Sequence, residues 1–182
     1  KIDEDEVKFV NEKEDKTIEL KFLSSGQQES LPMYSILFHS VKDNPRNGHF
    51  VVIEEPEAHL HPKGQEHIVE YISLLSNLIL EETENTPKYH FLITTHSPYI
   101  LENINHRILA KDLYDQEIDV TDIVPTEAML DINDINALDM SSDGTSKLAL
   151  NKEEKIIFSE SINDETNKIS IQLDSLLNSL KH

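Results

Sequence analysis

The sequence contains no cysteine, which excludes disulfides, thiol catalysis and cysteine-ligated zinc. No apolar run approaches the ~20 residues that a helix needs to cross a bilayer, and the N-terminus does not resemble a signal peptide. We therefore expect a cytoplasmic chain with no membrane partner. Basic residues are also scarce: 16 Lys and Arg against 35 Asp and Glu give a formal net charge of −19. Because nucleic-acid binding neutralises phosphates with Lys and Arg, this chain is not expected to bind a phosphate backbone by itself.

Glycine is scarce too: the sequence has four, at Gly26, Gly48, Gly64 and Gly144. A phosphate-binding P-loop needs the pattern G-x-x-x-x-G-K-[ST], in which glycines let the backbone wrap around the phosphates and the Lys contacts them. No such pattern can be drawn from these four positions. The 182 residues therefore lack the phosphate cradle of a P-loop nucleotide-binding protein.

The length of 182 residues suits one domain or a piece of a larger one. We find no internal repeat and no low-complexity linker, and we treat residues 1–182 as a single domain fragment. Acidic side chains crowd residues 1–15 and predict a solvated edge hairpin or a loose terminus. Alternation of apolar and charged residues over Ile18–Phe22 predicts a strand with one wet face.

Periodicity along the rest of the chain predicts alternating strands and helices. The apolar runs Phe50–Ile53 and His90–Thr95 are typical of strands buried on both faces, as in a parallel sheet. Helices are predicted over residues 31–41, with Pro32 tolerated in the first turn, and from about Pro62 to Leu80. Further elements are a short helix over Tyr99–Asn103, a strand around Arg107–Ala110, a hairpin turning at Asp143-Gly144, and an amphipathic helix from Ile162 to Leu180. This order predicts an α/β fold.

The strongest chemical signal is Glu54-Glu55, directly after the first apolar run. Ligands of open α/β sheets bind at the carboxyl ends of the strands. Of two adjacent carboxylates, one can hold Mg²⁺, often through water, while the next polarises an attacking water. The alternative is an acidic loop without a catalytic role.

Two other segments are weaker signals when each is taken alone. Ser24-Ser25-Gly26-Gln27 opens a helix, where a hydroxyl and free backbone N–H groups can bind an anion. A serine cap of the helix explains the same residues. His96 follows the second apolar run, where an imidazole can donate to a γ-phosphate or orient a water. A histidine at the end of a strand is more often incidental.

Taken in order, these segments resemble the second half of an ABC-type ATPase head. Leu23–Gln27 is similar to the ABC signature, Phe50–Glu55 to the Walker B motif, Glu57–Pro62 to the D-loop, and His96 to the switch histidine. The string Glu54–Pro62 followed by Thr95–Pro98 looks specifically like the RecF/OLD-like branch, the predicted ATPases of bacterial DNA repair and phage defence. The resemblance covers residues 18 to about 110 and is looser beyond them.

The resemblance implies a partial P-loop NTPase fold, with a mainly parallel sheet, flanking helices and a C-terminal helix. It implies ATP and Mg²⁺ as cofactors and a head-to-tail homodimer with two ATP molecules at the seam. Glu54 would position Mg²⁺, Glu55 would activate water, and His96 would sense the transferred phosphate. The remaining implied site residues are the nucleotide-binding Ser24, Ser25, Gly26 and Gln27, and the D-loop residues His59, Leu60 and His61.

This sequence departs from the family pattern in three places. Ser25 stands where transporter signatures carry glycine, and Glu54 stands where transporters carry aspartate. The third departure is the missing P-loop. We expect the chain to be the C-terminal half of a longer ATPase, whose Walker A half is then its first partner; a degenerate homologue that binds no nucleotide is the alternative.

Two other functions stay open on the sequence alone. The chain could be a non-hydrolysing module that docks a partner nuclease, with nucleic acid reached through other parts of the assembly. It could also be a metal-dependent hydrolase that uses His59 and His61 with the paired carboxylates. The ATPase hypothesis makes a geometric prediction: Glu54, Glu55 and His96 lie together at one sheet edge, with Ser24 away from them.

Overall fold

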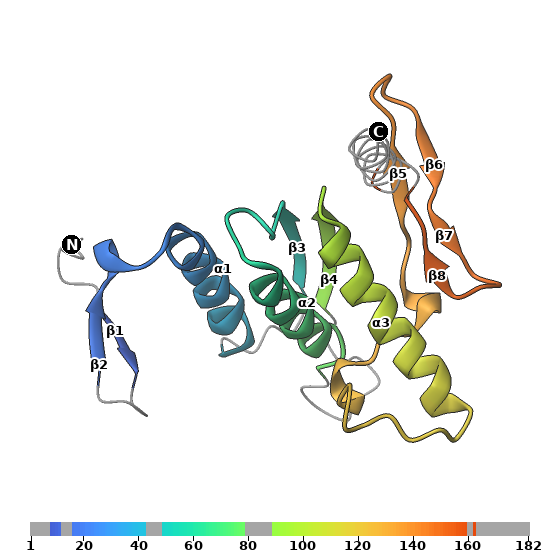
Figure 1. Cartoon of the computed structure of the whole chain (residues 1–182), viewed down its shortest axis with the longest axis horizontal. Helices are drawn as coiled ribbons and strands as arrows, with labels where there is room; N and C mark the ends of the chain where they lie inside the picture. Colours follow the sequence, from blue (N-terminus) through green and yellow to red (C-terminus); the bar gives the residue numbers. More distant parts are fainter. Residues whose placement is uncertain (1–7, 12–15, 43–48, 79–88, 160–161, 163–182) are drawn as a thin grey trace, which may run out of the picture.

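The computed structural model describes residues 8–11, 16–42, 49–78, 89–159 and 162 (Figure 1). Three helices, α1, α2 and α3, alternate with strands β3 and β4, and small antiparallel hairpins stand at both ends. The elements in chain order are β1 (Lys8–Asn11), β2 (Lys16–Glu19), the 3-10 turn η2 (Leu20–Phe22), α1 (Ser25–Lys42), β3 (His49–Glu54), α2 (Pro62–Ser76), β4 (Tyr89–Thr94), α3 (Pro98–Asp115), η3 (Thr126–Ala128), η4 (Ile132–Asp134), β5 (Leu138–Met140), β6 (Ser146–Leu148), β7 (Leu150–Asn151) and β8 (Ile156–Ile157).

Strands β3 and β4 form a parallel pair, as the two apolar runs predicted. Their register places Phe50 opposite His90 and Glu54 opposite Thr94. The other three strand pairs of the described residues, β1 with β2, β5 with β6 and β7 with β8, are antiparallel. The α/β class is therefore confirmed, while the larger, mainly parallel sheet stays a prediction.

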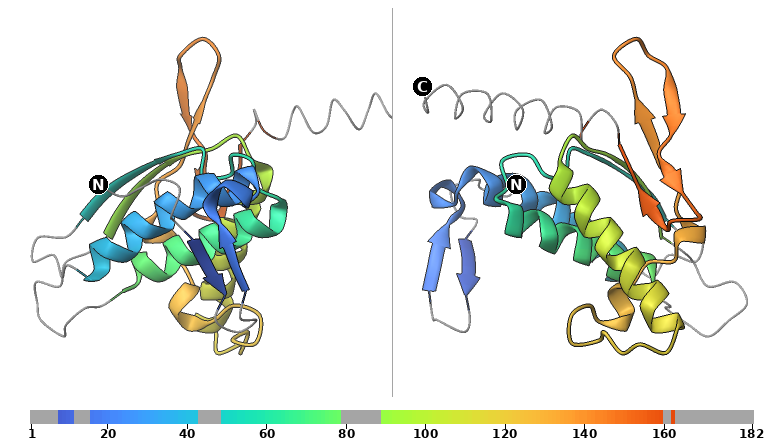
Figure 2. Two further views of the ribbon diagram at one scale, coloured as in Figure 1. Left: turned by 90° about the vertical axis from the view of Figure 1, so that its left-hand side faces the viewer. Right: turned by 45° about the vertical axis from the view of Figure 1, so that its right-hand side comes forward.

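Helices α1 and α2 lie along the same face of the β3–β4 pair (Figure 2). The core between the two helices and the two strands contains at least one apolar side chain from each of these four elements. Its buried members are Leu37 from α1, Ile53 from β3, Ile68, Ile72 and Leu75 from α2, and Tyr89 from β4. The spacing of three and four residues in α2 aligns its buried side chains on one helix face, as the sequence predicted. The predicted helix is too long, because α2 ends at Ser76 with Asn77 as its cap and Leu78 is not helical; Ile79 and Leu80 lie outside the described residues.

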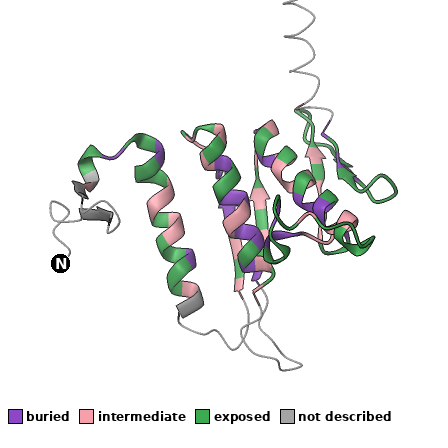
Figure 3. Cartoon of the chain, turned by 60° about the horizontal axis from the view of Figure 1, so that its bottom comes forward, coloured by how far each residue is buried: buried purple, intermediate pink, exposed green. Residues whose placement is uncertain are grey.

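The opposite face of the β3–β4 pair is uncovered in the part of the chain that the structure describes. Phe50 is 71% exposed, Val52 60% and Leu92 51%, whereas Ile53 on the other face is buried. Figure 3 shows this alternation along the two strands. The prediction that both faces are buried is therefore wrong for these residues. An apolar run shows that both faces of a strand can be buried, but not that the same chain supplies both covers.

Helix α3 replaces two elements that the sequence predicted separately. The short helix over Tyr99–Asn103 and the strand around Arg107–Ala110 are wrong, because one helix runs from Pro98 to Asp115. Ile100 and Ile108 are buried with Ile104 half-buried between them, and a repeat of four keeps all three on one face. A short apolar run such as Ile108–Ala110 does not separate strand from helix, which is why the sequence alone predicts a strand there.

Helix α1 begins at Ser25, as the helix-opening segment Ser24–Gln27 predicted, so the apolar stretch 31–41 continues that helix and Pro32 lies inside it, not in a first turn. Proline has no N–H, and one helical hydrogen bond to the Gln28 carbonyl is therefore lost. Strand β2 is also shifted: it ends at Glu19, and η2 covers the rest of the predicted strand. The pairing of β1 with β2 shows that the acidic N-terminal region contains a hairpin.

The predicted hairpin at Asp143-Gly144 is confirmed by the pairing of β5 with β6. Gly144 has a φ of 84°, a left-handed conformation that glycine adopts without steric cost. A second core forms where β7 and β8 pack beside α3, and it contains Ile108, Ile132, Ala149, Leu150 and Ile157. The predicted C-terminal helix beyond Ile162 lies outside the described residues. Within the described ranges, no helix has the length and apolar character to span a bilayer.

Replacing Ile68 by alanine tests the core between α2 and the β3–β4 pair. The side chain is almost fully buried, so Ile68→Ala should lower the free energy of unfolding by about 2–5 kcal/mol through lost burial and a residual cavity. Leu109→Ala is the control, because Leu109 is exposed on α3 and its removal should change stability by less than about 0.5 kcal/mol. Denaturant unfolding of both variants measures the difference, and equal effects would contradict this core assignment.

Candidate functional site

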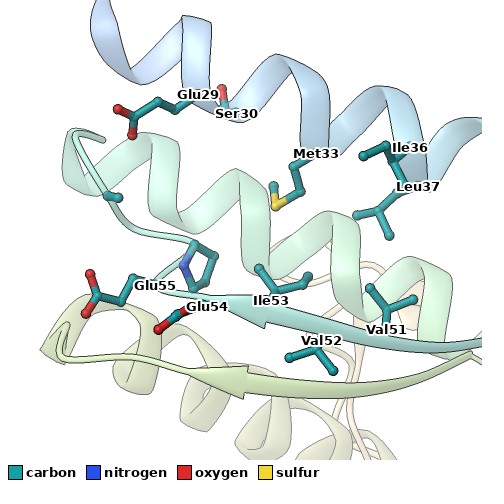
Figure 4. Close-up of a pocket in the computed structure, with 12 residues that line it drawn as sticks. Glu29, Ser30, Met33, Ile36, Leu37, Val51, Val52, Ile53, Glu54 and Glu55 are labelled. Atoms are coloured by element: carbon teal, nitrogen blue, oxygen red, sulfur yellow. The ribbon is translucent and has the colours of Figure 1, made fainter.

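Parallel pairing brings the ends of β3 and β4 to one edge of the sheet. Glu54 is in register with Thr94, and the next residue, Glu55, donates its backbone N–H to the Thr94 carbonyl at 2.9 Å. Glu55 has a φ of 46°, which is unusual for a residue with a side chain and marks the point where the backbone leaves the strand. Figure 4 shows Glu54 and Glu55 together at this end of β3.

Glu55 and His96 face one another across this edge. The Glu55 Oε1 lies 3.5 Å from the His96 Nε2, with side-chain exposures of 52% and 89%. The predicted proximity of the two residues is therefore confirmed. A contact this long between exposed groups contributes little to the stability of the fold. Because both side chains are exposed, a solute can reach the space around them.

Glu57 is a site residue whose contribution the sequence analysis missed. One oxygen of its carboxylate, Oε1, accepts hydrogen bonds from the Thr95 hydroxyl at 2.7 Å and from the His96 backbone N–H at 2.8 Å. The other oxygen, Oε2, is buried and has no hydrogen-bond partner among the described residues. From the sequence alone, Glu57 belongs to the D-loop segment and has no role of its own. It joins the loop after β3 to the loop after β4.

The segment Glu57–Pro62, called the D-loop here after the motif that it resembles, is held by its own backbone. Ala58 N–H donates to the Glu55 carbonyl, and Leu60 N–H donates to the Glu57 carbonyl, each at 2.9 Å. His59, like Glu55, has a positive φ, here 57°. Each non-glycine residue held in this region costs on the order of 1–3 kcal/mol. The surrounding hydrogen bonds must offset this cost.

A buried Gln65–Ser97 contact completes the connection between the two loops. Gln65, on α2, donates to the Leu60 carbonyl at 3.0 Å, and its Oε1 accepts from the Ser97 hydroxyl at 2.5 Å. Ser97 also donates its N–H to the Thr95 hydroxyl at 3.0 Å. Together with the Glu57 contacts, these bonds form a closed ring: Glu57, Thr95, Ser97, Gln65, Leu60 and back to Glu57. These bonds therefore join the loop after β3 to the loop after β4 through both side chains and backbone.

The signature-like residues form a capping box at the start of α1. Gln27 N–H donates to the Ser24 hydroxyl at 3.3 Å, and Ser24 N–H donates to the Gln27 side-chain oxygen at 3.0 Å. This reciprocal pattern satisfies two backbone donors of the helix start. Helix capping therefore accounts for Ser24 and Gln27, and a nucleotide-binding role for Ser24, Ser25, Gly26 and Gln27 stays a prediction. Within the described residues, no hydrogen bond connects Ser24 with Glu55 or His96, and the predicted separation stays a prediction.

The start of α1 packs directly against the D-loop. Gly26 is buried there, and a Cβ at this position would lie 2.5 Å from the His59 carbonyl oxygen and 2.8 Å from the Leu60 Cδ2. Only glycine fits without a shift of the backbone. The His59 Nε2 also lies 3.4 Å from the Glu29 Oε1 of α1. These contacts connect the signature region to the loop that carries Glu57.

The two D-loop histidines contact different partners. His59 faces Glu29, while His61 precedes α2 and its Nδ1 accepts from the Lys63 N–H at 3.4 Å. Among the residues that the structure describes, no group of three or more His, Asp or Glu side chains could hold a metal ion. The hydrolase hypothesis based on His59 and His61 therefore gains no support.

An open groove of about 380 Å³ lies between α1 and β3 and ends at Glu54 and Glu55. Its floor is apolar, and the ionisable residues in its lining are all acidic (Figure 4). The lining residues are Glu29, Ser30, Met33, Ile36, Leu37, Val51, Val52, Ile53, Glu54, Glu55, Pro56 and Ala58. Phosphates need basic side chains or clustered N–H groups, so this groove does not fit a nucleotide. The exposed carboxylates do fit Mg²⁺, which is commonly held by one or two carboxylates plus substrate phosphates.

The contact between α1 and the D-loop predicts different effects at two helical glycines. Gly26→Ala should destabilise the protein by about 1–3 kcal/mol, because the new methyl group would meet backbone atoms. Gly64→Ala is the matched control: its Cβ would lie 3.5 Å from the Leu60 side chain, and alanine favours the helix by up to about 1 kcal/mol. Thermal unfolding of the two variants measures the difference. A neutral Gly26→Ala would contradict the close packing.

Comparisons with known proteins identify the family of the chain. The family model "AAA ATPase domain" matches residues 1–101, more than half of the chain. A "Retron Vc95 probable ATPase" from Vibrio cholerae serotype O1 biovar El Tor is 32% identical over 90 residues, which cover 45% of this chain. The match spans 15% of that relative's length. The chain belongs to the AAA ATPase domain family.

Proposed function

We propose that this chain is the signature and Walker B half of an ABC-type ATPase head of the RecF/OLD-like branch, and that it takes part in ATP hydrolysis. The observation that carries the proposal is the 3.5 Å approach of Glu55 to His96 at the common edge of β3 and β4. Phosphoryl transfer depends mainly on positioning and electrostatic stabilisation. An acidic residue and an imidazole that share an accessible edge are suited to that task.

Each side chain at this edge has a distinct proposed task. Bound Mg²⁺ would neutralise charge at the phosphates. Glu54 is the residue proposed to hold it, either directly or through one of the waters that Mg²⁺ keeps. Glu55 orients the attacking water, since its carboxylate is exposed and can accept a proton from it. His96 contacts the transferred phosphate through an imidazole that is almost fully open to solvent. Ser24 and Gly26 act on the nucleotide of a second copy, in a head-to-tail homodimer, from the N-terminus of α1.

The phosphate cradle is proposed to come from a Walker A half outside these 182 residues. Two observations support this: no P-loop pattern exists in the sequence, and the uncovered face of the β3–β4 pair presents Phe50, Val52 and Leu92. The Walker A half would cover that apolar face and extend the two described strands into the mainly parallel sheet. The low coverage of the retron-associated relative agrees with a chain that is part of a longer protein.

The biological setting is proposed from the same relative and from the RecF/OLD-like motifs. A retron-associated probable ATPase favours anti-phage defence, and DNA repair is the other setting of this branch. Because the chain carries a formal net charge of −19, nucleic acid would be contacted by other parts of the assembly. A partner nuclease is the proposed effector, and a cytoplasmic location fits these partners.

One observation favours a second candidate function, a docking module that does not hydrolyse ATP. The capping box explains Ser24 and Gln27 without any nucleotide. In this case the ATPase surface binds a partner nuclease without turnover. Hydrolysis by the full-length protein that depends on Glu55 separates the two functions.

The isolated 182-residue chain should neither bind ATP tightly nor hydrolyse it. The P-loop provides most of the phosphate contacts in this class of ATPase, and the described groove beside Glu54 and Glu55 is acidic. Calorimetric titration with ATP and Mg²⁺ measures the affinity, with ADP as a comparison ligand. Binding with a Kd of about 1–10 μM together with steady turnover would contradict the proposed division of the head.

In the full-length protein, Glu55→Gln should trap ATP: binding persists while hydrolysis falls by a factor of about 10²–10⁴. Glutamine keeps the shape of the side chain and removes the charge that orients water. Glu153→Gln, on the exposed turn between β7 and β8, is the matched control and should leave turnover unchanged. Phosphate release and nucleotide retention are the measurements. Unchanged turnover in Glu55→Gln would reject the catalytic assignment.

A further inference from the structure

The His96 side chain has little around it that fixes its position. Its imidazole is 89% exposed, and its contact to Glu55 is 3.5 Å long. The backbone of His96 is held more firmly, because its N–H donates to the Glu57 carboxylate at 2.8 Å. Hydrogen bonds to an ionised carboxylate are shorter and stronger than those between neutral groups. The location of the imidazole therefore depends on the hydrogen bond from the His96 backbone N–H to Glu57.

The same carboxylate oxygen also fixes the residue before His96. The Thr95 hydroxyl donates to Glu57 at 2.7 Å and accepts from Ser97 N–H at 3.0 Å. Glu57 itself is held at its carbonyl by Leu60 N–H, and Gln65 connects Leu60 to Ser97. Within this ring, Glu57 is the D-loop residue whose side chain contacts the loop of His96.

We propose that Glu57 is a positioning residue that sets the place of His96 opposite Glu55 by clamping the Thr95–His96 backbone. The inference rests on the proposed function, in which Glu55 and His96 serve ATP hydrolysis. Glu57 acts through the position of its oxygen: it accepts two hydrogen bonds and contacts no reacting group. Since misplacing a reacting group by about 1 Å can cost a factor of 10² in rate, the clamp affects turnover without affecting nucleotide affinity.

Three substitutions of Glu57 separate the position of its oxygen from its charge. Glu57→Gln keeps an oxygen acceptor at the same place, because a carbonyl oxygen has two lone pairs. Glu57→Asp keeps the charge but withdraws the acceptor by one methylene group. Glu57→Ala removes the acceptor. The proposal predicts that turnover falls in the order wild type, Glu57→Gln, Glu57→Asp, Glu57→Ala.

The experiment uses the full-length protein and reads out three quantities: ATP turnover, ATP affinity, and hydrogen exchange at the His96 amide. For Glu57→Ala, we expect kcat to fall about 10- to 100-fold, an ATP affinity within about 3-fold of wild type, and at least about 10-fold faster exchange at His96. Glu57→Gln should stay within about 5-fold of wild type in turnover and retain the amide protection. Glu153→Ala is the control for loss of an exposed carboxylate and should change none of the three.

The outcomes are distinct from those that test the proposed function. The exchange rate of the His96 amide reports the clamp whether or not the protein hydrolyses ATP. Unchanged exchange in Glu57→Ala overturns the inference, and so does faster exchange with wild-type turnover in a protein whose turnover requires Glu55. Wild-type turnover in Glu57→Asp with a large loss in Glu57→Gln also overturns it, because charge and not position would then be the cause. If Glu57→Ala does not fold, the comparison of the Gln and Asp variants decides.

Discussion

The parallel register of β3 and β4 is the constraint on which the rest of the site depends. Glu54 pairs with Thr94 in this register, and the chains therefore leave the sheet side by side, with Glu55 and His96 as close neighbours. A shift of one residue would turn Ile53 from the core toward solvent, because successive side chains of a strand point to opposite faces. The core between α1, α2 and the strands thus fixes the register, and the register fixes the distance between the two proposed catalytic residues.

One loop, between β3 and α2, holds two residues in unfavourable backbone conformations beyond the sheet. Glu55 and His59 both have positive φ angles, and residues in such conformations concentrate at functional sites. The ring of hydrogen bonds through Glu57, Thr95 and Gln65 offsets this cost, and the tight approach of Gly26 closes the D-loop from the other side. The D-loop therefore contacts both the helix start that resembles a signature and the sheet edge that resembles a Walker B motif.

The sequence predicted the elements that combine periodicity with a clear boundary, and it failed where tertiary contacts decide. The strand Phe50–Ile53 agrees with β3 within one residue at each end, and the helix start at Pro62 is correct, because an apolar run and an N-terminal proline mark these positions. The predicted helix end at Leu80 lies beyond the observed end at Ser76. The strand predicted around Arg107–Ala110 is wrong, since three consecutive apolar residues, Ile108–Ala110, carry no period of their own. The contact of Glu55 with His96 followed from the family resemblance and from strand order. Glu57 could not be identified, because nothing in a sequence tells which of three glutamates near a strand end turns inward to the backbone of another loop.

The open face of the β3–β4 pair affects how copies of the chain associate in solution. Exposed apolar strands with one partner each, as the described residues show, favour edge-to-edge association of copies. The formal net charge of −19 opposes this association, because like-charged chains repel one another over the screening length, which is about 8 Å at physiological ionic strength and about 3 Å at 1 M. Charge therefore keeps copies of the chain dispersed while the face is open, and salt sets the concentration at which they begin to cluster. A segment that covers Phe50, Val52 and Leu92 takes the apolar face out of this association.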